Sequence, residues 1–312
     1  MSGASPFLHH GRGARDFMGK NGVDSVNTQP TTTGTMRSSV RRFFRQNRLS
    51  ALAVGVLGAI VLAAVIGPVV WPYSPNEINL DEALLRPGFS HPFGTDNQGR
   101  DVLARSLAGA RISLGVGLAA TVLSLLLGTT VGLLGGFFGR PIDSFAVILA
   151  DVTLAFPSLL LAIAISVVLP PGITSVFIAL SVVGWPTFTR LSRSVVFSIK
   201  QSEYFSAAVA VGCPNRRLVL KHVLPNCLPL LIVAASLRLG GFMLGEAALS
   251  FLGLGVQPPM ASWGSMISNG RDFLHSAPWI TLFPGMAIAL TIVSMNILGD
   301  SLRDYLDPKI RL

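Results

Sequence analysis

Three ionisable residues, Asp151, Arg238 and Glu246, lie within long apolar stretches of the sequence and could carry chemistry there. A charged side chain inside a hydrocarbon core is costly, so such residues usually face the interior of a helix bundle. They then line a transport pathway or form structural ion pairs. Arg238 and Glu246 are eight residues apart and do not share a helix face well, so we expect them not to pair. A bridge between Asp151 and Arg238 is the alternative pairing.

Motifs for nucleotide hydrolysis and for hydrolytic catalysis are absent from the sequence. The only Gly-Lys pair, Gly19-Lys20, is followed by Asn21 rather than by Ser or Thr, and neither H-E-x-x-H nor G-x-S-x-G occurs. His222 lies between Cys213 and Cys227, but this spacing fits no zinc pattern. We therefore predict no catalytic residues, no metal site and no cofactor bound by this chain.

Composition places the chain in lipid. Half of its 312 residues are hydrophobic and only 12% are charged, which leaves too little polar surface to cover a water-soluble globule. The net charge of +9 could attract nucleic acid, but the cations lie between apolar runs and form no continuous basic stripe. Nucleic acid is therefore not an expected partner, whereas membrane lipid is.

Six apolar intervals can supply helices that cross a bilayer, each of which needs about 20 residues. The intervals are residues 51–71, 112–139, a third that starts near residue 142, and then residues 173–188, 228–249 and a segment within 277–299. Pro170, Pro171 and Gly172 separate the third interval from the fourth, because these residues end helices. The sequence thus predicts an all-α membrane protein with about six transmembrane helices and a tight hairpin between the third and the fourth.

The distribution of Lys and Arg predicts the orientation, because these residues favour cytoplasmic loops. If the N-terminus is inside, eighteen Lys and Arg residues lie on the cytosolic side and five on the outer side. Both termini are therefore expected in the cytosol. Cys213 and Cys227 then lie in a reducing compartment, so we expect no disulfide.

The expected organisation along the chain follows from these spans. Residues 1–36 are predicted to be a disordered cytosolic tail, and residues 37–110 an N-terminal region with the first helix and a long polar outer loop. Residues 111–302 form the main transmembrane domain, and residues 303–312 a cytosolic tail. The amphipathic stretch 101–114 is expected to lie along the outer membrane surface.

Glycines at four-residue spacing predict close helix packing. They are Gly128, Gly132 and Gly136 in the second interval, and Gly241 and Gly245 in the fifth. Packing within one bundle and packing at a seam or gate between subunits are both compatible with this pattern.

The cytosolic segment 200–229 breaks the apolar pattern with a short helical stretch, a glycine and two prolines. Ala207, Ala208 and Val211 recur at helical spacing, so they form a small apolar face on which another protein could pack closely. Gly212 permits a turn, and Pro214 and Pro225 are expected to limit the helices that follow.

This segment resembles the cytosolic loop of the transmembrane permeases of bacterial binding-protein-dependent ABC importers, which carries E-A-A-x3-G-x9-I-x-L-P. Ala207, Ala208, Gly212, Leu224 and Pro225 match the pattern, whereas Ser206 replaces its Glu and His222 its Ile. Further stretches resemble the OppC/DppC-type subunit of the peptide importers: residues 91–114, 151–165, 245–267 and 298–311. The resemblance runs from about residue 37 to the C-terminus.

The resemblance implies a type I ABC importer permease fold of the MetI-like kind and a role in moving dipeptides or oligopeptides across the cytoplasmic membrane. It implies a B-type permease as partner, two cytosolic ATPase subunits that use ATP and magnesium, and an extracytoplasmic peptide-binding protein. The coupling loop would then contain the following residues: Glu203, Tyr204, Ala207, Ala208, Gly212, Leu224, Pro225 and Asn226. In this interpretation Glu203 supplies the acidic contact that Ser206 lacks, and the outer loop receives the binding protein.

Two other interpretations remain open at this point. The same machinery could carry nickel, glutathione or other small cargo. A stand-alone channel or ion-coupled secondary transporter is a function of a different class, and it would use Asp151 and Glu246 near the middle of the membrane. That second interpretation leaves the cytosolic segment 200–229 without a role.

Overall fold

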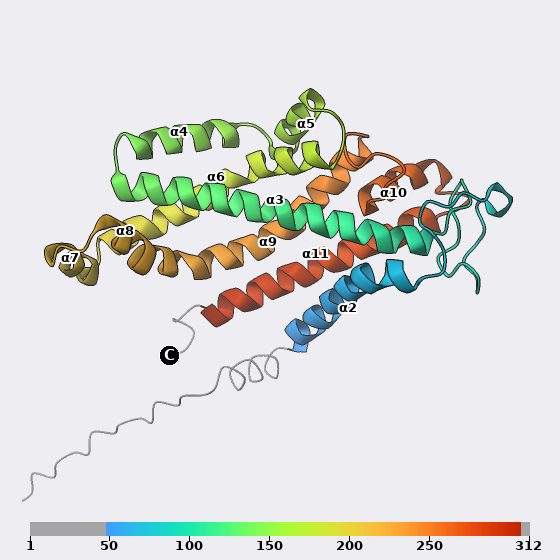
Figure 1. Ribbon diagram of the computed structural model, residues 1–312, viewed down its shortest axis with the longest axis horizontal. Coiled ribbons are helices and arrows are strands. Elements are labelled where there is room, and N and C mark those ends of the chain that lie inside the picture. The colour runs from blue at the N-terminus through green and yellow to red at the C-terminus, as the bar shows by residue number, and fades with distance from the viewer. Residues whose placement is uncertain (1–47, 307–312) are drawn as a thin grey trace, which may run out of the picture. The chain divides into compact units, whose positions relative to one another are not determined.

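A computed structural model describes residues 48–306 of the chain. Contacts divide the chain into residues 1–40 and residues 41–312, and all described residues lie in the second unit. The predicted tail 1–36 and residues 307–312 lie outside the described residues, as does the basic cluster 37–48 apart from Arg48. The described part contains ten α-helices, with short helical turns between some of them (Figure 1). They are α2 (Arg48–Val70), α3 (Val102–Phe138), α4 (Ile142–Ala155), α5 (Ser158–Val168), α6 (Ile173–Lys200), α7 (Glu203–Ala210), α8 (Asn215–Arg217), α9 (Leu224–Phe251), α10 (Trp263–Gly270) and α11 (Trp279–Leu306).

Five helical segments of the described chain are long and apolar enough to span a membrane, and a sixth is present if α4 and α5 together count as one bent span. This confirms the prediction of about six transmembrane helices. Between residues 48 and 306 the only pairing of strand type is an isolated bridge from Thr95 to Asp101, so the described fold is all-α.

The first span, α2, is hydrogen-bonded to α3 at carbonyl groups next to a proline. Pro68 has no N–H, so it cannot bond the carbonyl of Ala64 one turn earlier. Arg111 of α3 fills this gap: its Nε donates to the Ala64 carbonyl at 2.6 Å and its Nη2 to the Val65 carbonyl at 2.7 Å. Arg111, one of the five cations that the sequence places on the outer side, thus has a structural role.

The prediction for the stretch 101–114 is wrong. It is not a separate surface helix but, from Val102 on, the first turns of α3, which runs on without a break to Phe138. Asp101 caps this helix by accepting from the Ala104 N–H at 2.6 Å. Because Asp101 and Arg105 are almost fully buried against the loop that precedes them, the charges do not require a membrane surface. The expected boundary at residue 110 therefore falls inside a helix.

The third span is broken where the sequence predicted a continuous helix. α4 ends at Ala155, Phe156 adopts extended backbone angles, and α5 starts at Ser158 with its axis turned by 93°. Pro157 explains the break, because it disfavours helical angles at the residue before it and supplies no N–H. The predicted hairpin at Pro170 to Gly172 is present and leads into α6.

Close packing of α3 on α6 makes the centre of the bundle. A Cβ added to Gly128 would lie 2.3 Å from the Trp185 carbonyl oxygen, and one added to Gly132 would lie 2.4 Å from that of Thr189. Thr189 Oγ1 also donates across this contact to the Gly128 carbonyl at 3.0 Å. The glycine spacing in the second span therefore serves packing inside the bundle, whereas Gly241 of α9 has open space beside it.

The expectation that Pro225 limits the following helix is wrong. Helical structure continues from α8 through a π-helical segment (Leu218–Val223) into α9. Within it the Leu224 N–H bonds the Val219 carbonyl, five residues back. Such a widened turn accommodates residues that break the regular hydrogen-bond pattern, so Pro225 fits into the first turn of α9.

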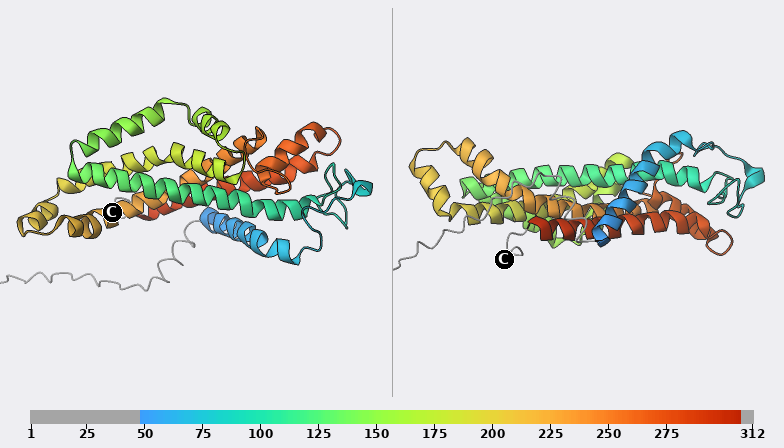
Figure 2. Two further views of the ribbon diagram at one scale, coloured as in Figure 1. Left: turned by 45° about the horizontal axis from the view of Figure 1, so that its top comes forward. Right: turned by 90° about the horizontal axis from the view of Figure 1, so that it is seen from below.

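The two ends of the bundle carry different structures. α7 and α8 lie at one end, and the loop between α2 and α3 lies with α10 at the other (Figures 1 and 2). The loop is held in place by Trp71 Nε1 and His91 Nδ1, which bond the carboxylate of Asp101 at 3.1 and 2.8 Å. Trp279 Nε1 at the start of α11 donates to the Thr95 carbonyl at 3.0 Å.

Candidate functional site

The predicted cytosolic helix is present as α7. Two residues separate it from the end of α6, and Val211 is its C-cap residue. Gly212 follows with φ +81°, a left-handed conformation that glycine adopts without strain, so it ends the helix as the sequence predicted. Pro214 then precedes α8, with extended backbone angles. Local sequence therefore defines α7 on both sides.

One aromatic side chain anchors α7 to the bundle. Phe205 is buried in a cluster with Ile199 at the end of α6, Val223 at the end of the π-helical segment and Cys227 in the first turn of α9. Its ring lies 6.5 Å from that of Phe137 at the end of α3, in an edge-on arrangement. Phe205 therefore connects α7 to the ends of three membrane-spanning helices.

The opposite side of α7 is exposed. Glu203, Ser206, Ala207 and Ala210 are exposed along this side, and Val211 beyond the helix is 89% exposed. Ala208 instead packs partly against the Phe205 cluster, so it belongs to the attachment and not to the exposed face with which sequence analysis grouped it. The small side chains on this face allow a partner to approach the backbone closely.

The remaining residues of the predicted loop lie on the α9 side. Leu224 packs against the Phe205 cluster, whereas Pro225 and Asn226 are exposed in the first turn of α9. Asn226 Nδ2 donates to the His222 carbonyl at 2.6 Å. The His222 ring lies 6.4 Å from that of Tyr204, which joins α7 to the π-helical segment. The match to the loop pattern thus covers two adjoining helices.

The three intramembrane ionisable residues do not come together. Asp151 of α4 accepts from Arg190 Nη2 of α6 at 2.5 Å, and Arg238 of α9 donates to Thr187 Oγ1 at 2.7 Å. The suggested bridge between Asp151 and Arg238 is therefore absent. Sequence could not decide this pairing, because it does not fix how α4 is aligned along α6.

Glu246 is enclosed within the bundle. It is 1% exposed, and its two carboxylate oxygens accept from Ser113 at 3.0 Å and from Ser250 at 2.7 Å. As predicted, it does not pair with Arg238. Its partners connect α3 with α9, so the arrangement is that of a structural polar contact between two spans.

Two charged contacts near α7 were missed by sequence analysis. Arg193 of α6 forms a bidentate ion pair with Asp143 of α4: its Nε donates to Oδ1 at 2.5 Å and its Nη2 to Oδ2 at 2.8 Å. Lys200 Nζ at the end of α6 donates to the carbonyls of Gly136 and Phe137, where α3 ends. A lysine at the end of one helix and an acid in the first turn of another were visible signals, but their partners depend on the fold.

No group of three or more His, Cys, Asp or Glu side chains in residues 48–306 is arranged to hold a metal ion. Cys213 and Cys227 are both free thiols. What the structure shows around α7 is an exposed helix face attached to the bundle through Phe205.

Comparison with known families gives a result that covers most of the chain. Residues 125–312 match the family described as binding-protein-dependent transport system inner membrane component. The chain belongs to this family. Residues 35–87 of this permease also match the description N-terminal TM domain of oligopeptide transport permease C.

Similar proteins extend the family match to nearly the whole permease. It is 44% identical to the dipeptide transport system permease protein DppC of Alkalihalophilus pseudofirmus, over 90% of this chain and 94% of the relative. It is 40% identical to the oligopeptide transport system permease protein OppC of Bacillus subtilis, over 86% and 88%. A di/tripeptide permease, DppC of Pseudomonas aeruginosa, is 42% identical over 81% and 85%.

A solved structure supports the fold. The permease chain superposes on a chain of the MetNI methionine ABC transporter, in an inward-facing conformation, with a TM-score of 0.54. The match covers 66% of this chain and 97% of the other at 18% identity, which shows a shared fold. The expected type I, MetI-like architecture is thereby confirmed, and the protein is a multi-pass membrane permease of an ABC importer.

Proposed function

We propose that this permease is the C-type subunit of an importer for dipeptides or oligopeptides. The observation that carries the proposal is its 40 to 44% identity to DppC and OppC permeases over more than four fifths of their lengths. The chain pairs with a B-type permease in this proposal, and each of two cytosolic ATPase subunits contacts one permease. An extracytoplasmic peptide-binding protein delivers the cargo.

In the proposed mechanism α7 transmits the force. ATP-driven closure of the ATPase subunits, which alone use ATP and magnesium, pulls on the exposed face of α7. Because Phe205 fixes α7 to the ends of α6 and α9, the pull tilts these spans and moves the cavity between the two permeases from outward-open to inward-open. Glu203 and Ser206 lie on the exposed side of α7 and offer polar contacts to the motor.

The orientation is part of the proposal. The excess of Lys and Arg, eighteen against five, supports a cytosolic α7 and cytosolic termini in a bacterial inner membrane. The short exposed helix between α6 and α9 supports a permease that works with a motor, and gives no support to a stand-alone ion-coupled transporter. Nickel or glutathione is the alternative cargo.

Docking is tested by substitution of Ala207, a small residue on the exposed face of α7. Ala207→Trp should prevent close approach of the ATPase and lower its recovery with the tagged permease by about tenfold, a loss of about 1.4 kcal/mol. Ala207→Ser keeps the size and is the matched control, with normal recovery expected. Equal recovery of the ATPase with both variants would contradict docking at this face.

Cargo is tested by uptake. Cells that lack other peptide importers and express the whole complex should accumulate a labelled dipeptide, and the Ala207→Trp variant should not. Accumulation of nickel or glutathione in place of the dipeptide would leave the machinery intact but would refute the proposed cargo.

A further inference from the structure

A cleft of about 530 Å³ lies at the end of the bundle opposite α7. Its walls are the loop before α3, the loop after α9, and α10 with the turn that follows it. Charged and amide side chains that line it include Arg100, Arg105, Gln257, Asn269 and Arg271. Its volume is that of a small-molecule site and its lining is strongly polar. None of the functions assigned above uses it.

Two arginines form one wall of this cleft, and both are buried. Arg100 is 9% and Arg105 is 3% exposed. Asp96 is the only carboxylate within ion-pair distance of either one in the described chain: its Oδ2 lies 2.7 Å from Arg100 Nε and 3.6 Å from Arg105 Nε. Two buried cations thus share one anion, an arrangement that favours a second anion because an unpaired buried charge is costly.

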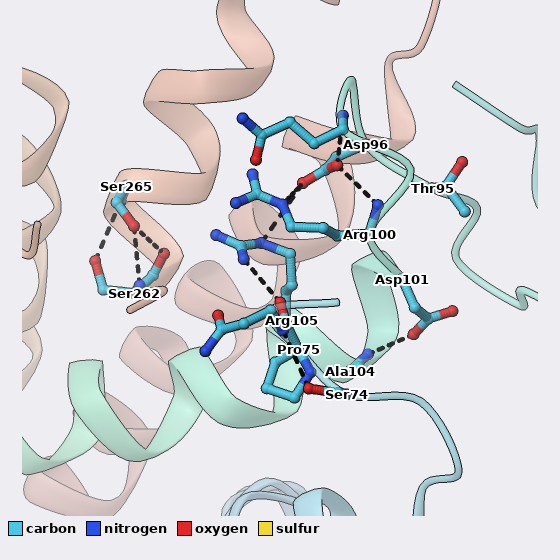
Figure 3. A network of polar contacts seen from close by, with 12 residues as sticks. Ser74, Pro75, Thr95, Asp96, Arg100, Asp101, Ala104, Arg105, Ser262 and Ser265 are labelled. Carbon is cyan, nitrogen blue, oxygen red and sulfur yellow. Dashed lines mark hydrogen bonds and ion pairs between the residues drawn. The ribbon is translucent and has the colours of Figure 1, made fainter. Parts of the chain in front are cut away.

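The arginines keep donors free for such an anion. Arg105 uses Nη1 to bind the Pro75 carbonyl at 2.8 Å, whereas within the described residues the two terminal nitrogens of Arg100 make no hydrogen bond to the protein. Figure 3 shows the two guanidinium groups one above the other on the same side of Asp96. A planar guanidinium with free terminal N–H groups matches the two oxygens of a carboxylate.

The rest of the cleft suits a small organic molecule. The side chain of Asn269 is exposed and, like that of Gln98, makes no hydrogen bond within the described part of the chain, so both amides are available to a ligand. Arg271 also lines the cleft, where it forms an ion pair with its exposed neighbour Asp272 at 3.2 Å and lies over the Phe251 ring. The concave volume fits a ligand of a few residues better than it fits a protein surface.

We propose that this cleft binds the carboxylate of a small organic ligand, with Arg100 and Arg105 as the carboxylate site. The identity of the ligand rests on the proposed function: it is a short peptide, bound through its free C-terminal carboxylate. The cleft holds this peptide at the outer mouth of the permease, after its release from the binding protein and before its entry into the pathway.

The test measures how fast a cysteine in the cleft reacts. Asn269→Cys is introduced into a chain with Cys213→Ser and Cys227→Ala, and the complete complex without its binding protein is placed in nanodiscs. The rate of modification by an anionic thiosulfonate reagent is measured with acetate, succinate, the dipeptide Ala-Ala and its C-terminal amide. The three carboxylates should each slow labelling by about fivefold, and the amide by less than about twofold.

Substitutions assign the effect to the arginines. Arg100→Gln should abolish the protection. Arg100→Lys keeps the cation beside Asp96 but lacks the planar pair of terminal N–H groups, so it should weaken the protection and serves if the first variant fails to fold. Arg86→Gln is the matched control, because Arg86 is an exposed arginine of the same outer loop that does not line the cleft. Protection should survive in this control.

Import of the dipeptide by the same complex, reconstituted in proteoliposomes with binding protein added, separates this inference from the proposed function. Absence of protection by every carboxylate overturns the inference whether or not the dipeptide is imported, and so does equal protection by the dipeptide and its amide. Protection by carboxylates without import would support the carboxylate site and refute the proposed cargo. If added binding protein slows labelling and no carboxylate does, the cleft is a docking surface for that protein, and this result would also overturn the inference.

Discussion

At the scale of single residues, the charges of this permease are mostly held by partners on neighbouring helices. Asp143 and Arg193 join α4 to α6, with 15% and 33% of their side chains exposed. Arg193 also lies over the Phe197 ring, at 4.6 Å from its centre. These contacts fix the start of α4 against α6.

This ion pair supports a prediction. Asp143→Arg should place two cations together and destabilise the complex by about 3 kcal/mol, measured as a drop in thermal unfolding temperature in detergent. The swap Asp143→Arg with Arg193→Asp should recover at least half of the loss, because opposite charges again face each other. The control double variant, Asp143→Arg with Arg217→Asp, has the same net charge but changes an exposed arginine far along the chain. Equal recovery in the control would contradict a specific pair.

Sequence identified which residues were unusual but not their partners. Asp151, Arg238 and Glu246 stood out because charges are rare in apolar runs, and Gly212 because only a turn explains it. The partners Arg190, Thr187 and Ser113 come from other helices. They depend on helix alignment, which no local pattern encodes.

At the scale of elements, the contact between α3 and α6 organises the bundle. It is possible because Gly128 and Gly132 leave no side chain between the two backbones. Helices in lipid gain little from apolar burial against each other, so close approach and hydrogen bonds between helices carry more of the stability.

Gly132→Ala tests this contact. The new methyl group would meet the Thr189 carbonyl and the Ser192 hydroxyl, so α3 and α6 must separate. We expect a loss of about 2 kcal/mol in stability, seen as a lower unfolding temperature and less assembled complex. Gly115→Ala in the same helix is the control, since nothing lies within 4 Å of its added Cβ. If both variants behave alike, the packing explanation fails.

The elements also show where sequence patterns are reliable. Uncharged intervals predicted where spans exist, but they excluded the charged first turns of α3 from that helix. Asp101 and Arg105 are buried there because a loop that the sequence does not place forms hydrogen bonds with them. The break at Pro157 was missed because the stretch around it stays apolar. The π-helical segment before Pro225 was missed because a proline usually indicates a helix end.

At the scale of the whole molecule, the two ends of the bundle carry different structures. The end with α7 offers a small exposed face attached to the tips of α3, α6 and α9. The end with α10 holds the cleft lined by Arg100 and Arg105. Family membership and α7 together account for a permease that receives its energy from a separate motor.

The most direct test of this account is photocrosslinking from α7 in living cells. A photoreactive amino acid at Val211, which is 89% exposed, should crosslink to the ATPase subunit. The same probe at Phe89, fully exposed in the outer loop, should not. Crosslinks from Val211 to the ATPase and none from Phe89 are the predicted result. Crosslinks from Val211 only to extracytoplasmic proteins would contradict both the orientation and the role of α7.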